Sequence, residues 1–279
     1  MIGFELRDMT AADVDAAVAL ALAQGWRDRR SFYWFVLRTA TCQPVVGTVD
    51  GQLIATGLAT ANGAVGWLGA VVVAEAVRRR GYGRAMTEEL RRRLLGAGCA
   101  TLSLVATPAG RPLYERMGFR LATHYHQLQA DHIDEMPIIS AGARLRPMKP
   151  EDLPAIFELD RRATAEDRSV PLGTLAETGG WVLEDANGLR GFLLPADRAY
   201  GATVAPRFED GLFLLDLHRH LVPVGGHVRA GIPDEHAAAW HELQARGWEE
   251  TWQAPRLILG PAPNWRPEWI WGQINSAMG

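Results

Sequence analysis

The sequence predicts an α/β (α+β) fold in which one kind of domain occurs twice along the chain. Two observations predict it. An apolar strand at residues 66–73 runs into a glycine-containing turn and then into a helix at residues 83–95. The strand-to-helix pattern of the first residues also starts again after residue 143. Recurrence of a pattern along one chain indicates tandem copies of a structural unit.

Length and composition limit the number of domains and the classes of partner that the chain can have. The 279 residues are 48% hydrophobic and 22% charged, which is typical of globular proteins and suggests about two domains. The net charge of −3 argues against binding to nucleic acid, for which a basic domain is expected. No apolar run approaches the ~18 residues that span a bilayer, and the first ten residues do not resemble a signal peptide. Two cysteines are too few for a disulfide framework or a zinc site. We expect a cytoplasmic protein with no metal and no membrane partner.

The elements of the first half follow from periodicity and turn signals. A short strand at residues 4–7 precedes a helix at 11–23, for which Thr10 is the expected N-cap. Asp50-Gly51 is a type I′ turn signal between two strands. The remaining expected elements are a helix within residues 26–37, hairpin strands at 45–49 and 53–61, a strand at 101–105, a short helix at 111–117 and a last strand starting at Phe119.

The turn after the strand at residues 66–73 carries the strongest functional signal. Arg78, Gly81 and Gly83 form the pattern Arg-x-x-Gly-x-Gly at the start of a helix. The first N–H groups of a helix have no partner within it and lie at the positive end of its dipole, so they bind phosphate groups. A solvated basic face does not explain the two glycines, each of which costs about 0.5–1 kcal/mol relative to alanine. The spacing fits neither a P-loop nor a dinucleotide site.

This turn, with the valines before it and Arg-Pro-Leu-Tyr-Glu-Arg-Met-Gly-Phe at residues 111–119, resembles the acetyl-CoA-binding region of the GNAT (Gcn5-related) N-acetyltransferases. The resemblance covers nearly the whole chain. The order of the two halves resembles a bacterial tandem-GNAT group with a degenerate second domain. It implies a mixed, mostly antiparallel sheet flanked by helices in each domain. The expected division is a catalytic GNAT domain at residues 1–136, a linker at 137–143 and a degenerate GNAT-like domain at 144–279.

The resemblance implies acetyl-CoA as the donor and an amine as the acceptor. The strand would bind the pantetheine arm through its backbone, and its exposed amides would polarise the thioester carbonyl. The turn would hold the pyrophosphate. The expected cofactor-binding residues are Val71, Val72, Val73, Arg78, Arg79, Arg80, Gly81, Tyr82, Gly83, Arg84, Thr107 and Arg111. Thr107 stands where many GNAT enzymes carry an asparagine.

Tyr114 is the candidate catalytic residue, because family members place a tyrosine beside the CoA sulfur and a phenol protonates a leaving thiolate. The alternative is a tyrosine that only packs on the cofactor. The general base stays open. His124, His126, Glu75 and a chain of water molecules to bulk solvent are all candidates.

The acceptor pocket is expected between the first helical segment and the second domain. Trp26, Tyr33 and Trp34 are candidates for its aromatic wall, with a place in the core as the alternative. The candidates from the second domain are Asp160, Asp167 and Arg168, and His124 is a further candidate. A small-molecule amine is the expected acceptor. A protein acetyltransferase and a non-catalytic acyl-CoA sensor are the alternatives. The acceptor, the acyl-chain preference and the oligomeric state stay open.

The second copy has lost this chemistry. Leu145-Arg146-Pro147-Met148 repeats Leu6-Arg7-Asp8-Met9, and residues 240–248 repeat the short helix before Phe119, so that Leu243 stands where the first copy has Tyr114. The strand at residues 200–205 runs into Pro206 and two acidic residues, which offer no amide at the proline and repel a phosphate. We therefore expect one CoA site per chain. The tail tryptophans Trp265, Trp269 and Trp271 are expected to dock on the first domain, with an independent second domain as the alternative.

Overall fold

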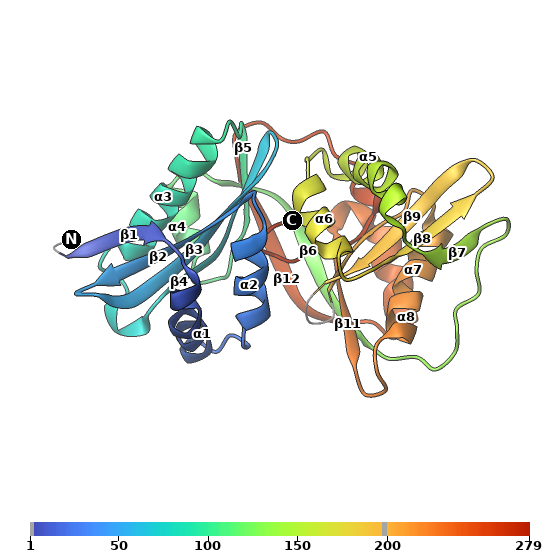
Figure 1. The fold of residues 1–279 in the computed structure, drawn as a ribbon, viewed down its shortest axis with the longest axis horizontal. Coiled ribbons are helices and arrows are strands. Elements are labelled where there is room, and N and C mark those ends of the chain that lie inside the picture. Colours follow the sequence, from blue (N-terminus) through green and yellow to red (C-terminus); the bar gives the residue numbers. More distant parts are fainter. Residues whose placement is uncertain (1–2, 197–199) are drawn as a thin grey trace. The chain divides into compact units, whose positions relative to one another are not determined.

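The computed structural model describes residues 3–196 and 200–279 (Figure 1). Met1 and Ile2, at the start of the expected catalytic domain, lie outside the described residues. The chain forms two compact units. Unit 1 comprises residues 1–120, 258–261 and 276–278, and unit 2 comprises residues 121–257, 262–275 and Gly279.

Unit 1 is a mixed sheet with helices against it, as the sequence predicts. Its strands lie in the order β1-β2-β3-β4-β5, antiparallel except for the parallel pair β4 and β5. The elements are β1 (Phe4–Asp8), α1 (Val14–Ala23), α2 (Arg30–Arg38), β2 (Cys42–Val49), β3 (Gln52–Asn62), β4 (Val65–Val73), α3 (Tyr82–Gly96), β5 (Thr101–Val105) and α4 (Arg111–Arg116). The side chain of Met86 in α3 packs closely on the backbone of β3, because a Cβ on Gly57 would lie 2.7 Å from Met86 Sδ. Asp50 and Gly51 both have positive φ, as a type I′ turn requires.

Unit 2 repeats the same order of elements. It contains β6 (Arg120–Asp131), apart from its first residue, β7 (Arg144–Pro147), α5 (Leu153–Thr164), α6 (Ser169–Ala176), β8 (Trp181–Asp185), β9 (Gly188–Pro195), β10 (Gly201–Val204), α7 (Phe208–Leu221), β11 (His227–Pro233), α8 (Ala237–Ala245), most of β12 (Glu249–Leu259) and β13 (Ile270–Gly272). Five strands form one sheet in the order β13-β10-β9-β8-β7. Strands β12, β6 and β11 are neighbours, in that order, in the other sheet. Helix α7 supplies much of the core, including Leu214 and Leu215.

Matching contacts confirm the repeat. In the first copy Arg7 binds both carboxylate oxygens of Asp13 at 2.7 Å. In the second, Arg146 binds both oxygens of Asp152 at 2.7 and 2.8 Å. Each ion pair ties the first strand of its copy to the turn before the first helix. The copies therefore begin with the same local structure, as the sequence repeat predicts.

The strand that ends the first copy belongs to unit 2, and the end of β12 belongs to unit 1. Strand β6 ends the first copy but pairs with β11 in unit 2, from Tyr125 to Asp131. Residues 258–261, which end the last strand of the second copy, lie in unit 1, where Thr101 Oγ1 donates a 2.6 Å hydrogen bond to Pro261 O. The compact units thus differ from the divisions at 136 and 144, because a sequence repeat does not specify which neighbour a terminal strand takes.

The tail tryptophans pack within unit 2. Trp265 lies 6.4 Å from Tyr125, which belongs to the expected first domain, whereas Trp271 packs in the second copy and not on the first domain. Trp271 is fully buried, and its Nε1 donates to Ala205 O at 3.1 Å. Arg256 lies over the ring of Trp265 at 4.7 Å, and Arg162 over the ring of Trp269 at 5.1 Å. The physical reason for Trp271 is that α7 of its own copy offers the ring a buried place beside Gly211. In the ranges that the structure describes, no helix is both long enough and apolar enough to cross a membrane.

Candidate active site

Strands β4 and β5 separate part of the way along their length. They pair in parallel at Val65, Gly66 and Trp67, and the register ends there although β4 continues to Val73. Within this continuation, Ala70 has a φ of +50°, which is uncommon for a residue other than glycine, and the register with β3 shifts at the same place. Thr56 Oγ1 donates a 3.1 Å hydrogen bond to Ala70 O and so helps to hold this bulge. The second half of β4 therefore presents backbone groups on its β5 side.

The turn after β4 leads into the first turn of α3. Gly81 caps the helix with a φ of +89°, a conformation that explains the glycine. Gly83 has no such conformation. A Cβ at Gly83 would meet only Leu113 Cδ2 at 3.6 Å and Val73 Cγ2 at 3.8 Å, which are ordinary contacts. Neither backbone strain nor packing explains this second glycine, which leaves the helix amides open to a close ligand.

The structure brings the main parts of the expected cofactor site together. Val73 at the end of β4, Gly83 in α3 and Leu113 in α4 meet around one point. Val71, Val72 and Val73 lie in the separated part of β4, and Arg79 and Arg80 are exposed in the turn. The side chain of Tyr82 does not belong to this site, because its ring packs 4.6 Å from that of Phe4 in the core.

The other arginines are partly engaged in contacts with the protein. Arg78 donates from Nε to Val73 O at 3.3 Å and from Nη2 to Gln24 Oε1, which fixes the turn to the end of β4. Arg84 pairs with Glu88 at 2.8 Å, and Arg111 pairs with Glu115 at 2.7 Å. Both pairs are exposed, so they contribute little to stability. Thr107, just after β5, accepts a 3.2 Å hydrogen bond from Gly110 N on its hydroxyl.

Tyr114 is buried in α4 with 8% of its surface exposed, and its ring lies 6.1 Å from that of Phe119. Gly110 makes room for it, because a Cβ there would lie 3.1 Å from Tyr114 Cε2. Burial raises the pKa of Tyr114 to about 12. The phenol therefore keeps its proton at neutral pH.

The aromatic candidates for the acceptor wall have different surroundings. Tyr33 is a core residue with 2% of its surface exposed. Trp26 is half-buried, with the guanidinium of Arg29 over its ring at 5.0 Å. Trp34 is 47% exposed and lines a surface pocket of about 620 Å³.

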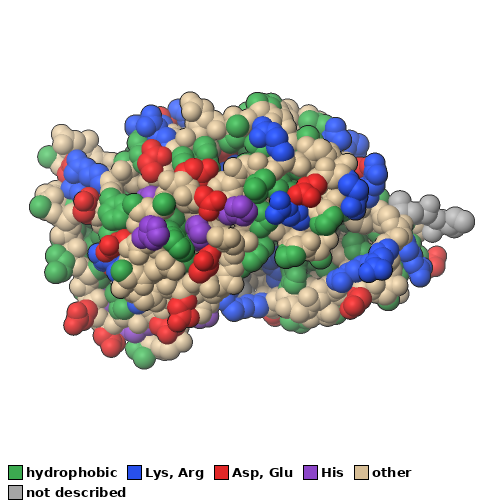
Figure 2. Space-filling view, turned by 180° about the vertical axis from the view of Figure 1, so that it is seen from behind, with side chains coloured by type: hydrophobic (Ala, Val, Ile, Leu, Met, Phe, Trp, Pro, Cys, Tyr) green, Lys and Arg blue, Asp and Glu red, His purple; other side chains and the backbone are tan. Residues whose placement is uncertain are grey.

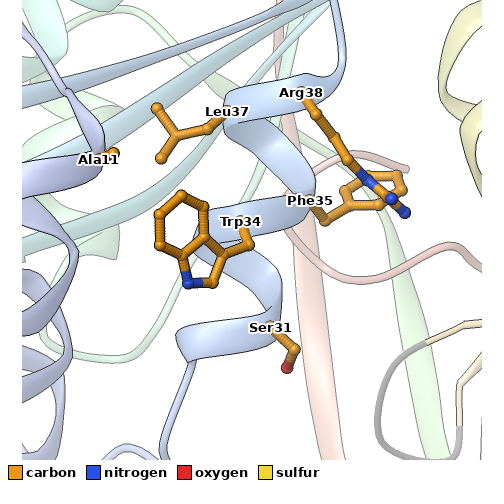
Figure 3. A pocket seen from close by; sticks show the side chains of 6 residues that line it. All are labelled: Ala11, Ser31, Trp34, Phe35, Leu37 and Arg38. Atoms are coloured by element: carbon orange, nitrogen blue, oxygen red, sulfur yellow. The ribbon is translucent and has the colours of Figure 1, made fainter.

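This pocket lies on the outer face of α2 (Figure 3). In Figure 3, Trp34 and Leu37 extend from the helix towards Ala11, and Phe35 and Arg38 lie on its other side. Ser31, Trp34, Phe35 and Arg38 are spaced three and four residues apart, so together they form one broad helical surface that reaches both sides seen in Figure 3. Sequence reasoning named only Trp34 of this set, although the spacing could have identified the rest.

The candidates from the second copy have roles in the fold of unit 2. Arg168 binds both oxygens of Asp160, at 3.0 and 2.5 Å, and both side chains are almost fully buried. The two charges that were expected to face an acceptor are thus paired with each other. Asp167 Oδ1 accepts hydrogen bonds from Ser169 N and Oγ and so starts α6. The structure therefore gives no support to these residues as ligands of a substrate.

The histidines considered as bases are held by carboxylates of unit 2. His124 Nδ1 lies 3.0 Å from Asp234, and His126 lies between Asp234 at 3.0 Å and Glu250 at 2.8 Å. Glu75, the remaining candidate, is exposed in the short turn after β4. Of these three side chains, only Glu75 belongs to the unit that contains the glycine turn.

Other features of the described residues bear on ligand class. Side chains of both charge signs are interspersed on the face shown in Figure 2. No group of three or more histidine, cysteine or acidic side chains among the described residues could hold a metal ion. Cys42 and Cys99 are buried, and burial raises the pKa of Cys42 to about 12, so it is a poor nucleophile.

In the second copy, the corresponding strand edge is covered. Strand β10 pairs with β9 on one side and with β13 on the other, at Thr203 and Val204. The ring of Trp271 in β13 lies against α7, since a Cβ on Gly211 would be 1.8 Å from Trp271 Cε2. A segment of the chain itself thus occupies the edge that stays open in β4.

Comparison with known proteins agrees with this geometry. Residues 10–119 match the family model described as "Acetyltransferase (GNAT) family". The N-acetyltransferase Eis of Mycobacterium tuberculosis (strain ATCC 25177 / H37Ra) is 30% identical over 210 residues, which cover 70% of this chain and 46% of that protein. The chain thus aligns with about half the length of these curated relatives.

Two solved structures share the whole fold. A putative acetyltransferase from Pyrococcus horikoshii superimposes with a TM-score of 0.81 at 21% identity and covers 100% of this chain and 97% of its own. A tandem GNAT protein from the clavulanic acid biosynthesis pathway superimposes with a TM-score of 0.67 at 19% identity and covers 93% of this chain and 99% of its own. At these identities the likeness establishes the tandem architecture alone.

Proposed function

The chain belongs to the GNAT family of acyltransferases, and on this premise we propose that it transfers an acetyl group from acetyl-CoA to the amine of a small molecule. One observation carries the proposal. The open edge of β4 ends at a glycine turn whose second glycine, Gly83, has no explanation in the fold itself. An extended pantetheine arm fits the edge as an added strand, and a pyrophosphate fits the helix N-terminus.

We propose the following roles for the residues in the reaction. The amine nitrogen attacks the thioester carbonyl, the C–N bond forms and the C–S bond breaks. Amides in the separated part of β4, at Val71 to Val73, stabilise the negative charge that develops on the carbonyl oxygen. Tyr114 gives its proton to the departing thiolate. The proton of the amine leaves to water. The two histidine candidates are held by carboxylates of unit 2, and Glu75 is exposed to solvent in the turn after β4.

The cofactor-binding part of the proposal uses main-chain groups more than side chains. The amides of residues 79–84 hold the pyrophosphate, and Arg79 and Arg80 add positive charge from the surface. Arg78 acts indirectly, because its contact with Val73 O fixes the turn. We keep residues 1–136 as the catalytic copy, 137–143 as its linker and 144–279 as the copy without a CoA site.

A direct test is to incubate the full chain with acetyl-CoA and a pool of small-molecule amines and peptides, and to identify acetylated products by mass. The proposal predicts an acetylated small amine. Acetylation confined to peptides would favour a protein acetyltransferase. Binding of acetyl-CoA without any product would favour a sensor.

The first prediction concerns Tyr114. The Tyr114→Phe variant should lower kcat for the identified amine by roughly 10²–10⁴-fold, the usual range for a positioned acid. CoA affinity should change little, because the ring and its contact with Phe119 remain. Release of the CoA thiol measures kcat, and calorimetry measures affinity. Wild-type turnover in this variant would reduce Tyr114 to a packing residue.

A further inference from the structure

Residues 276–278 belong to unit 1 and reach the middle of β4. A Cβ on Gly69 would lie 2.4 Å from Ala277 Cβ and 2.6 Å from Ala277 Cα, closer than a real Cβ comes to another atom. Gly69 does not have a positive φ, so its backbone conformation does not require a glycine. The close approach of the 276–278 segment does require one.

A second contact holds the 276–278 segment in this place. Asn62, the last residue of β3, donates from Nδ2 to Met278 O at 3.2 Å. Asn62 and Met278 are fully buried, and Ala277 is 4% exposed. The segment is therefore part of the packed interior of unit 1, where it is fixed at two points along the hairpin of β3 and β4.

Ala277 covers a face of β4 and leaves the edge of this strand open. Side chains stand on the faces of a sheet and alternate between them along a strand. A Cβ on Gly66 would meet Leu94 of α3 at 2.9 Å. Gly69 lies three residues further along β4 and so faces away from α3. The 276–278 segment and a pantetheine arm paired with the edge can therefore be present together.

The contact lies directly beside the bulge in β4. Gly69 precedes Ala70, whose φ is +50°, and follows Trp67, the last residue of β4 that pairs with β5. A strained residue keeps its conformation only where its surroundings hold it. The hydroxyl of Thr56 holds the carbonyl of Ala70, and Ala277 packs against the residue before it. The bulge is thus held from β3 and from the face of the sheet.

We propose that the 276–278 segment positions β4 for acyl transfer. By packing on Gly69 it fixes the bulge at Ala70, and the bulge orients the amides at Val71 to Val73 towards the carbonyl oxygen of the bound thioester. This role rests on the proposed function. Ala277 is a positioning residue, because it acts through β4 and does not contact the substrate. Donors to a developing negative charge are effective only when they are held in place, so movement of the segment should slow the reaction more than it weakens CoA binding.

The test compares Gly69→Ala with a matched control, Gly66→Ala, in the full chain. Both add one methyl group to a buried position of β4, with nearest contacts of 2.4 Å and 2.9 Å, so both should lower Tm. Gly69→Ala should also lower kcat by about 10–100-fold, because Ala277 must move and the amides lose their alignment. Gly66 lies where β4 still pairs with β5, so Gly66→Ala should leave kcat unchanged.

Release of the CoA thiol, with the amine found in the product screen, measures kcat, and calorimetry with free CoA measures affinity. The affinity should stay as in the wild type in both variants, because the amides that hold the pyrophosphate are untouched. Wild-type kcat in Gly69→Ala would overturn the inference alone. An equal loss of kcat in Gly66→Ala would also overturn it, and so would a loss of CoA affinity in Gly69→Ala as large as its loss of kcat.

Asn62→Ala decides the question if Gly69→Ala does not fold. This variant releases Met278 O and adds nothing to β4. It should lower kcat and keep the affinity for free CoA, and wild-type kcat in it would overturn the inference. A wild-type protein that binds neither acetyl-CoA nor free CoA would overturn the proposed function and the inference together.

Discussion

The two copies within this chain share one order of elements and differ most at one strand edge. In the first copy, β4 leaves β5 after Trp67 and keeps its remaining edge open. In the second, β10 takes β13 on the corresponding side, and Trp271 fills the space against α7. The proposed cofactor site has thus become part of a hydrophobic core in the second copy.

The comparison shows that a fold of this kind has two ways to satisfy an open strand edge. A ligand that offers amide groups can pair with it, or a further strand of the protein can. In the second copy the proline and acidic residues after β10 would weaken phosphate binding, and the buried ring of Trp271 leaves no room for the arm. Loss of the turn chemistry and closure of the edge are therefore two independent barriers to cofactor binding.

The prediction with the largest expected effect on cofactor affinity tests the open site. Gly83→Asp should weaken acetyl-CoA binding at least about 100-fold, because a carboxylate at the helix N-terminus repels the pyrophosphate. The fold should survive, since a Cβ there makes only ordinary contacts. Calorimetry measures the affinity, and thermal unfolding checks the fold. Unchanged affinity would contradict the assignment of the turn.

Its matched control lies at the same helical position in the second copy. Glu209 is the second residue of α7, as Gly83 is of α3, and it is exposed. Glu209→Ala should leave acetyl-CoA affinity as in the wild type. A loss of affinity in the control would mean that the second copy also binds the cofactor.

Much of this architecture could be predicted from the sequence, because it is encoded locally. The glycine turn, the type I′ hairpin and the repeated ion pairs depend on residues close together in the chain. The alignment of Leu243 with Tyr114 is confirmed by matching bonds, from Phe119 N to Tyr114 O and from Trp248 N to Leu243 O, both 3.0 Å.

Features that depend on distant partners were not predicted. Alternation of apolar residues marks residues 120–131 as a strand but does not say that β11 is its neighbour. The expectation for Trp271 had the same weakness, because ring size predicts burial but not the place of burial. The acidic candidates illustrate the same dependence on distant partners. Asp160 is as suited to Arg168 as to a cationic substrate, and only the fold decides between them.

The next prediction tests whether Trp271 closes the degenerate copy. A Cβ on Gly211 would lie 1.8 Å from Trp271 Cε2, and both residues are packed in the core. Gly211→Ala should therefore destabilise the protein by about 3 kcal/mol or more, above the usual range for overpacking. This corresponds to a fall in Tm of roughly 6–12 °C. Acetyl-CoA affinity should persist below the transition.

Gly173→Ala is the matched control for that substitution. Gly173 lies inside α6 of the same unit, and a Cβ there would lie 3.8 Å from Phe157 Cζ. Because alanine favours a helix more than glycine does, the control should raise stability by about 0.5–1 kcal/mol. Equal Tm values for the two alanine variants would show that Trp271 moves aside freely.

The prediction with the smallest expected effect concerns the pH dependence of stability, which should differ between the corresponding helices α3 and α7. In α7, burial lowers the pKa of His218 to about 4. The unfolded chain binds a proton below pH 6.5 that the folded chain refuses, so stability is complete above pH 6.5 and falls as the pH drops towards 4. In α3, the hydrogen bond from Arg92 lowers the pKa of Glu89 to about 2, and its contribution is lost only below about pH 4.5.

Between pH 7.5 and 5 the titration of His218 should therefore lower the free energy of unfolding, and the titration of Glu89 should not change it. We expect the free energy of unfolding to fall by about 2 kcal/mol over this range because of His218, from 1.36 kcal/mol per pH unit below 6.5. Burial of His236 lowers its pKa too and acts in the same direction. Urea denaturation at the two pH values measures the change. His218→Gln should flatten the pH dependence, and Glu89→Gln should leave it as in the wild type. An equal slope in wild type and His218→Gln would mean that acid weakens the second copy by another route.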